Sequence, residues 1–249
     1  MANTLSVLPR SHSSDLRSMA IALEDEVWAG LGFLSYTDAH QKHYEELLDD
    51  HADLQLCLVD DDTGVPVALA NCVPANWDLT TPLPDEGWDW LVEEGGRGSR
   101  SAYGVLGALA ISVPARHRGK GHAQRLIREL RDLADRRGGG TLIAPVRPSS
   151  KWMHPVASMH DYIGWKDAGG RCYDPWLRSH LGQDGRLLGV CGSSMVVRQH
   201  VAFWETWSGM QFEKSGSYAV EGGLVPVEID LEMEIGTYIE PNVWVAYRN

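Results

Sequence analysis

A short glycine loop followed by a basic helix holds the residues of this chain best suited to bind an anion. Gly119 and Gly121 are separated by one lysine, and an amphipathic segment begins directly after them. Glycine lets a backbone come close to a ligand and adopt conformations that a Cβ atom would block. The first turn of the helix adds unpaired amides at the positive end of the helix dipole. The spacing therefore predicts a phosphate-binding loop.

The segments around the loop predict a strand, a helix and a second strand. Residues 103–113 form an almost continuous apolar run, which is typical of a buried strand. Apolar residues then recur every three or four positions from Ala123 to Ala134, until the glycines of 138–140 end the helix. Residues 141–146 are short and apolar enough for the next strand. A tight turn between strand and helix is the alternative explanation of the glycines.

The glycine spacing differs from the loops that bind dinucleotides and nucleoside triphosphates. Instead, Arg118-Gly-Lys-Gly-His-Ala123 resembles the Arg/Gln-x-x-Gly-x-Gly/Ala signature of the GNAT superfamily of acyl-CoA N-acyltransferases, with Arg116 or Arg118 opening the motif. The motif follows a strand and a proline, as it does in that family. The resemblance is best over residues 101–146. Segments 144–151 and 174–178 look like those of uncharacterised actinobacterial members.

The resemblance implies a fold, a donor substrate and a set of binding residues. The fold is a mixed, mostly antiparallel central sheet with splayed central strands, flanked by helices. The donor is acetyl-CoA or another acyl-CoA, and the acceptor is a small-molecule amine. Separately, no metal is expected, because only His40 and His43 share a helical face at close spacing and no third ligand accompanies them. Backbone amides around Ile111 and Val113 meet the acyl carbonyl and the pantetheine arm in the gap between the strands. The residues that hold the coenzyme A pyrophosphate are Arg118, Gly119, Lys120, Gly121, His122 and Ala123.

Direct attack of an amine on the thioester needs a base for the amine and an acid for the leaving thiolate. Members of the family often use a tyrosine as the acid, and the resemblance points to Tyr162 in His160-Asp-Tyr-Ile-Gly-Trp165. The usual pattern places more residues between that tyrosine and the following glycine, so Tyr173 is an alternative. Either hydroxyl could instead pack in the core.

The base is left open, because residues 101–113 contain no Asp or Glu where several family members carry a catalytic carboxylate. The candidates by position are His154, His160, Asp161 and Glu205. Each is also compatible with a surface or hydrogen-bonded structural role. Positioning of the reactants and polarisation of the carbonyl by amides could then supply most of the acceleration.

The charges are unevenly distributed along an acidic chain of net charge -12. Residues 97–151 contain twelve Lys or Arg against three acidic residues. A basic segment around a glycine loop predicts a phosphate-rich ligand, while a solvated helix face is the ordinary explanation of such arginines. Two other functions stay open. One is an aminoacyltransferase that takes its acyl group from aminoacyl-tRNA, and the other is a noncatalytic acyl-CoA-binding regulator.

The remaining sequence predicts one domain, residues 1–249, with an insertion at 74–100 and an elaborated acceptor-side part at 152–249. Apolar periodicity predicts two early helices, and Thr37 can cap the second. A hairpin is expected over 54–73. The insertion, rich in Pro, Gly and Trp, is either an acceptor lid or a packed excursion.

Beyond Lys151 the pattern predicts further helices and strands. Helices are expected at 153–165 and 175–181, and strands at 187–197, 218–220, 224–229 and 238–245. The four cysteines are too scattered for a metal or redox motif and are expected to be buried thiols. The chain has no signal peptide or membrane-spanning run, so a cytoplasmic location is expected.

Overall fold

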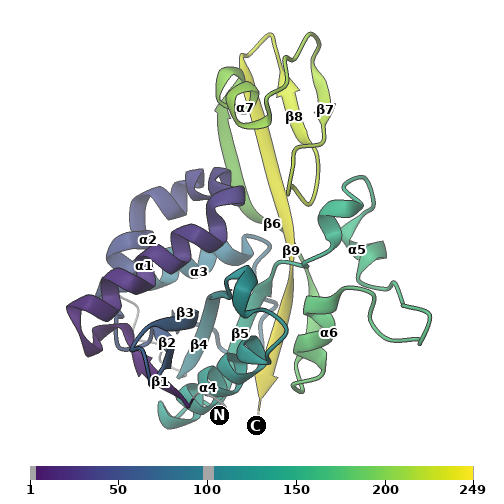
Figure 1. Cartoon of the computed structure of the whole chain (residues 1–249). Coiled ribbons are helices and arrows are strands. Elements are labelled where there is room, and N and C mark those ends of the chain that lie inside the picture. The colour runs from purple at the N-terminus through teal and green to yellow at the C-terminus, as the bar shows by residue number, and fades with distance from the viewer. Residues whose placement is uncertain (1–3, 98–103, 249) are drawn as a thin grey trace.

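The computed structural model describes residues 4–97 and 104–248 and shows one mixed sheet with helices on both faces (Figure 1). The strand order is β1-β2-β3-β4-β5-β9-β8-β7, and β6 pairs with β9. The strands are β1 (Leu5–Pro9), β2 (Leu56–Asp60), β3 (Pro66–Ala75), β4 (Val105–Ser112), β5 (Thr141–Val146), β6 (Arg186–His200), β7 (Gly216–Tyr218), β8 (Val227–Asp230) and β9 (Ile235–Arg248). Among the described strands only β4 and β5 pair in parallel. The predicted fold class is therefore confirmed.

Most of the helices lie in two layers, one on each face of the sheet (Figure 1). They are α1 (Ser14–Trp28), α2 (Asp38–Asp50), α3 (Gly87–Gly96), α4 (His122–Arg136), α5 (Met159–Tyr162), α6 (Pro175–Leu181) and α7 (Val201–Ser208). Short 3-10 helices lie at η1 (Arg10–His12), η2 (Ala29–Tyr36), η3 (Ala115–His117) and η4 (Lys151–Met153). One core lies between the sheet and α4 and α6, and another lies between the sheet and α2, α3 and η2.

The predicted strand, loop, helix and strand are β4, the 113–121 loop, α4 and β5. The apolar stripe of α4 is buried against the sheet at Leu126, Ile127, Leu130 and Ala134. Such burial of one face is what fixes an amphipathic helix in a fold. Tyr103, the predicted first residue of the strand, lies outside the described residues.

The central strands β4 and β5 separate shortly after they meet. Their pairing consists of Leu106 with Leu142 and Gly107 with Ile143, after which β4 continues to Ser112 and β5 to Val146. The predicted splay of the central strands is thus confirmed. Because parallel strands end at the same side of a sheet, the gap opens toward the loop that leads into α4.

The predicted elements before the centre of the sheet are also present. Ser13 Oγ accepts a hydrogen bond from the amide of Leu16 at 3.1 Å, and Thr37 Oγ1 accepts one from His40 at 3.1 Å. These two bonds cap α1 and α2 at their N-termini. The following hairpin consists of β2 and β3.

Segment 74–100 contributes α3 to the core as far as the structure describes it. Leu91 and Val92 on α3 are fully buried, and Trp77 and Trp88 are 7% and 8% exposed. The tryptophans anchor the segment, so its described part packs as a fixed layer against β3, β4 and β6.

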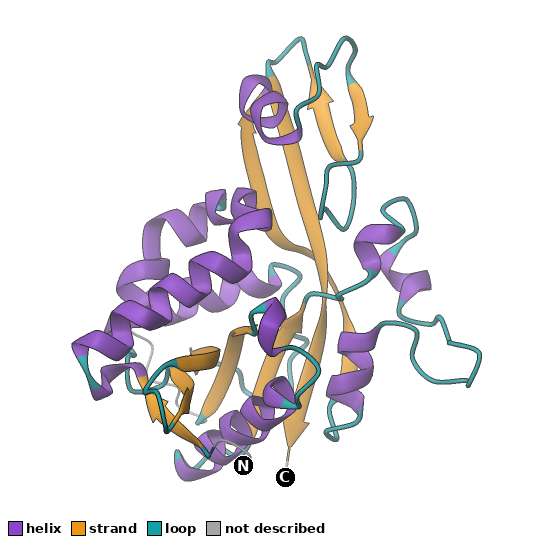
Figure 2. Cartoon of the chain, viewed as in Figure 1, coloured by secondary structure: helices purple, strands orange, loops and turns teal. Residues whose placement is uncertain are grey.

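The C-terminal part forms an arm that projects from the rest of the molecule (Figure 2). We define the arm as α7, β7, β8 and the halves of β6 and β9 that pair with each other beyond Met195 and Glu240. In its lower half β9 lies between β5 and β6, and in its upper half between β8 and β6. Strand β9 therefore belongs both to the central sheet and to the arm.

The predicted single helix over 153–165 is wrong. The chain there forms only η4 and the single turn α5, with loops around them. Pro155 has no amide to donate within a helix, and Ser158 starts a new turn by accepting a hydrogen bond from the Asp161 amide at 3.0 Å. The strand predicted at 224–229 begins only at Val227, and the strand predicted at 218–220 lies at 216–218.

Two further expectations concern cysteines and membrane spans. All four cysteines are buried, as predicted. In residues 4–97 and 104–248, no helix is both long enough and apolar enough to cross a bilayer.

Candidate active site

The glycine loop has the backbone geometry that an anion site needs. Gly119 and Gly121 have φ angles of +75° and +78°, a region that favours glycine. A Cβ atom added to either would meet no atom within 4 Å, so the space above the loop is open. Gly121 is the N-cap of α4 and no side chain caps the helix. The amides of residues 119–124 donate to no other described residue and remain available to a ligand.

Two histidines flank the amides without adding charge at neutral pH. The rings of His117 and His122 lie 6.3 Å apart. The pKa of His117 is lowered by burial first and then by Lys120 and Arg116. The pKa of His122 is lowered by burial first and then by His117, Lys120 and Arg125. Both imidazoles are therefore neutral near pH 7 and can act as hydrogen-bond partners of an anion, while Lys120 supplies positive charge.

The predicted acyl-binding residues lie where β4 has separated from β5. Strand β4 has a bulge there, because Cys72 of β3 pairs with Ala108 and Asn71 pairs with Ala110, leaving Leu109 as an extra residue. Ile111 follows the bulge, and Val113 directly follows the strand. Both are half-buried. The structure thus brings the predicted strand-end residues and the glycine loop together at one end of the gap.

The arginines of α4 are largely bound by the protein itself. Arg125 donates to the Leu5 carbonyl at 2.9 Å, and Arg128 to Gln183 Oε1 at 2.9 Å. Arg131 donates to the Gln183 carbonyl at 2.8 Å and stacks on Tyr247. These contacts join α4 to β1 and to the end of α6. The basic segment is therefore in large part a set of structural contacts, which leaves a smaller phosphate-binding surface than its net charge predicts.

Tyr162 is placed in the core by the structure. Its side chain is 1% exposed, and its hydroxyl donates to Asp174 Oδ2 at 2.9 Å. The same carboxylate accepts from the Ser150 amide at 2.8 Å and caps α6. Burial, and next the Asp174 carboxylate, raise the pKa of Tyr162, which makes proton donation less favourable. The assignment of Tyr162 as the acid stays a prediction, and this geometry argues against it.

Tyr162→Phe distinguishes a structural role of the hydroxyl from a role as the catalytic acid. We expect a loss of about 1 kcal/mol in the free energy of unfolding, the usual effect of removing one buried hydrogen bond, with kcat close to that of the wild type. Urea denaturation and steady-state kinetics measure the two effects. A large fall in kcat without a change in stability would restore Tyr162 as the acid.

The other candidate acids and bases divide into two groups. Tyr173 and His154 are hydrogen-bonding partners, with the hydroxyl 3.2 Å from Nε2, and both pack against Trp165. The remaining candidates are engaged locally or exposed. Asp161 accepts from the Ser158 hydroxyl, and Glu205 accepts from the Phe212 amide in the arm, while His160 is exposed.

A buried ion pair beside the gap was not predicted from the sequence. Arg147, directly after β5, donates from Nε and Nη2 to the two carboxylate oxygens of Glu240 at 2.9 and 3.0 Å. Glu240 is fully buried on β9, and Tyr238 also donates to it at 2.6 Å. The available signal was a glutamate inside the largely apolar strand segment 238–247. In the described part of the chain, no cluster of His, Cys, Asp and Glu has a metal-binding arrangement.

The sequence of the chain is similar to those of known acetyltransferases. Residues 21–160 match the model of the Acetyltransferase (GNAT) family. The chain is similar to arginine N-acetyltransferase avaD of Aspergillus versicolor, with 32% identity over 243 residues, which cover 86% of this chain and 83% of that protein.

Two solved structures share the fold across nearly the whole chain. The loading GNATL domain of CurA from Lyngbya majuscula has a TM-score of 0.62 at 15% identity, covering 99% of this chain and 98% of its own. The GNAT-like decarboxylase GphF, solved in complex with isobutyryl-CoA, has a TM-score of 0.56 at 16% identity, covering 98% of each chain. At these identities the likeness shows a shared fold and nothing about the substrate.

Proposed function

The chain belongs to the GNAT acetyltransferase family and is an acyltransferase, and we propose that it moves an acetyl or other acyl group from acyl-CoA to an amine of a small molecule. We infer further that the acceptor is cationic. The net charge of -12 supports this, because an acidic protein attracts cations. The similarity to a protein named as an arginine N-acetyltransferase supports arginine or a related guanidinium compound.

The observation that carries the proposal is the uncapped N-terminus of α4. Among the described residues, its first amides and those of Gly119 and Gly121 have no hydrogen-bond acceptor, and a Cβ atom at either glycine would meet only open space. A diphosphate fits such a group of amides, since both the hydrogen bonds and the helix dipole favour negative charge. In this proposal Arg118, Lys120, His122 and Ala123 complete the donor site.

The proposed reaction is a direct transfer in the gap between β4 and β5. The neutral amine nitrogen attacks the thioester carbon, the C–N bond forms, and the C–S bond breaks. The amine loses a proton and the departing thiolate gains one. The amides of Ile111 and Val113 are proposed to hold the carbonyl oxygen and the pantetheine arm, so that charge on the oxygen is stabilised as it develops.

A thermal-shift comparison of acetyl-CoA, longer acyl-CoAs and charged tRNA tests the donor. Acetyl-CoA at 100 times its Kd should stabilise the protein by about 2.7 kcal/mol. Charged tRNA is expected to give no specific stabilisation, because the α4 arginines are engaged within the protein. Stabilisation by tRNA that falls steeply with salt, with none by acetyl-CoA, would favour the aminoacyltransferase instead.

An acceptor screen completes the test. Arginine and citrulline form a matched pair, because citrulline has nearly the same shape but no cationic guanidinium. We expect acetylation of a cationic amine or guanidinium compound and much slower reaction of its neutral counterpart. Tight acyl-CoA binding without transfer to any acceptor would identify a noncatalytic regulator and contradict the proposal.

A further inference from the structure

A chain of buried hydrogen bonds leads around the gap from the end of β5 to the bulge of β4. Arg147 binds Glu240, whose Oε1 accepts from Asn242 Nδ2 at 3.2 Å. The Asn242 Oδ1 accepts from the Ser194 hydroxyl at 2.8 Å. Ser194 Oγ in turn accepts from the backbone amide of Trp88 at 2.9 Å, and Trp88 Nε1 donates to the Leu109 carbonyl at 3.0 Å. We call this chain the brace.

The brace is buried from Glu240 to Leu109, while Arg147 at its first end is 17% exposed. Glu240 and Ser194 are fully buried, Asn242 is 1% exposed and Trp88 is 8% exposed. Water therefore offers little competition for these bonds, and a broken link would leave polar groups unsatisfied in the core. Such a network favours one arrangement of the elements that it joins. These elements are β5, β9, β6, α3 and β4.

Helix α3 packs closely on β6 at Gly87. A Cβ atom at Gly87, which has a φ angle of +37°, would collide with the Ser194 hydroxyl and with Cys191 Sγ. Glycine at this position lets the next amide, that of Trp88, reach the Ser194 hydroxyl. The first turn of α3 is thereby fixed on the bulged part of β6.

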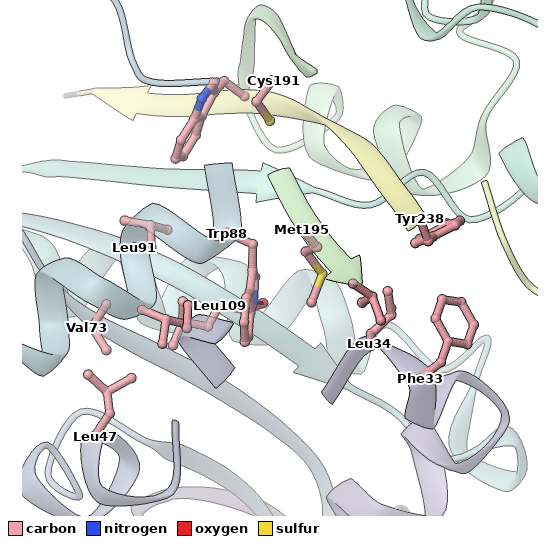
Figure 3. Close-up of a cluster of buried hydrophobic side chains, with 14 of the residues drawn as sticks. Phe33, Leu34, Leu47, Val73, Trp88, Leu91, Leu109, Cys191, Met195 and Tyr238 are labelled. Atoms are coloured by element: carbon pink, nitrogen blue, oxygen red, sulfur yellow. Dashed lines mark hydrogen bonds between the residues drawn. The ribbon is translucent and has the colours of Figure 1, made fainter. Parts of the chain in front are cut away.

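The last link of the brace meets β4 at its bulge. Figure 3 shows Trp88 extending from α3 to Leu109 in the buried cluster that also contains Met195 and Leu91. Leu109 is the extra residue of the bulge, and its peptide group is planar. Fixing its carbonyl therefore restricts the orientation of the following peptides, which carry the strand to Ile111.

We propose that Trp88 is a positioning residue for acyl transfer. Through the brace it holds the β4 bulge, and with it the amide of Ile111, at a set place relative to the end of β5. This inference rests on the proposed function, in which that amide holds the acyl carbonyl. Helix α3 then contributes to the reaction by holding the carbonyl-binding amide in place.

Trp88→Phe tests the last link because it keeps an aromatic ring and removes the indole N–H. We expect kcat to fall about tenfold, a fraction of the loss seen when an oxyanion-binding amide is removed outright. The Kd of coenzyme A and the KM of the acceptor should stay within about twofold of wild type, because the substitution removes a contact to the β4 bulge and none to the glycine loop.

Trp77→Phe is the matched control. Trp77 is 7% exposed and donates from Nε1 to the Thr81 carbonyl at 2.8 Å, outside the brace. This variant loses an indole hydrogen bond to a carbonyl that is only partly buried, so its loss of stability should be no larger than that of Trp88→Phe, with unchanged kcat. Equal kcat values for Trp88→Phe and Trp77→Phe would overturn the inference.

Ser194→Ala provides a second test of the brace. If both residues act through the brace, the effects of Ser194→Ala and Trp88→Phe on kcat should be strongly non-additive in the double variant. Additive effects would contradict an action of both residues through the brace.

An active wild type with no specific effect of Trp88→Phe overturns this inference alone, whereas a wild type that binds no acetyl-CoA overturns the proposed function as well.

Discussion

Gly121→Glu is expected to weaken acetyl-CoA binding by about 100-fold or more while the protein stays folded. A Cβ atom at Gly121 meets no atom within 4 Å, so a side chain fits here, and a glutamate places a negative charge next to the amides proposed to hold the diphosphate. Placing like charges together costs several kcal/mol, and each 1.4 kcal/mol corresponds to a factor of about ten in Kd. Isothermal titration calorimetry at fixed ionic strength measures the change.

Gly138→Glu provides the matched control for this variant. Gly138 follows the other end of α4, has a φ angle of +87° and also has no atom within 4 Å of an added Cβ. Both substitutions strain the backbone by about 1 kcal/mol or slightly more, so their effects on stability should be similar. Only Gly121→Glu should lose the donor. Unchanged affinity in that folded variant would refute the loop as the diphosphate site.

Arg147→Met is expected to cause the largest loss of stability among these variants. It removes the cation but leaves the Glu240 carboxylate fully buried. Breaking a buried ion pair from one side typically costs about 3–5 kcal/mol. Because Arg147 also donates to the Gly222 carbonyl at 2.6 Å, the contact between β5 and the loop before β8 is lost too. Urea denaturation gives the free energy of unfolding.

Arg137→Met is the matched control, because it removes the arginine of an ion pair on the surface. Its partner Asp53 lies 3.8 Å away, and the two side chains are 44% and 67% exposed, so the loss should be below about 1 kcal/mol. Adding Glu240→Gln to Arg147→Met should recover part of the lost stability, because it removes the uncompensated charge. Equal losses in Arg147→Met and Arg137→Met would show that the buried pair has no special role in joining β5 to β9.

The sequence was informative where local patterns decide the structure. The change in apolar spacing after Gly121 predicted β4, the glycine loop and α4, because a buried strand and an amphipathic helix have different periods. Helix α6 was predicted with its observed ends, since Pro175 and the Asp174 cap mark its start. The helix expected over 153–165 failed because the apolar pattern continued across Pro155, which interrupts a helix.

The less predictable features depend on partners far apart in the sequence. The arginines of α4 looked like a surface for phosphate, but their partners near Leu5 and Gln183 are apparent only in the fold. The brace likewise joins Trp88 to Ser194 over 106 positions, and no local spacing indicates it. Tyr162 was chosen by resemblance to a family pattern, whereas its burial depends on the tertiary contact with Asp174.

A crystal structure of the protein with acetyl-CoA tests the central claim most directly. The account predicts pyrophosphate oxygens at about 3 Å from the amides between Gly119 and Ala123, with the thioester beside Ile111 in the gap between β4 and β5. A donor bound elsewhere, with those amides facing solvent, would contradict it.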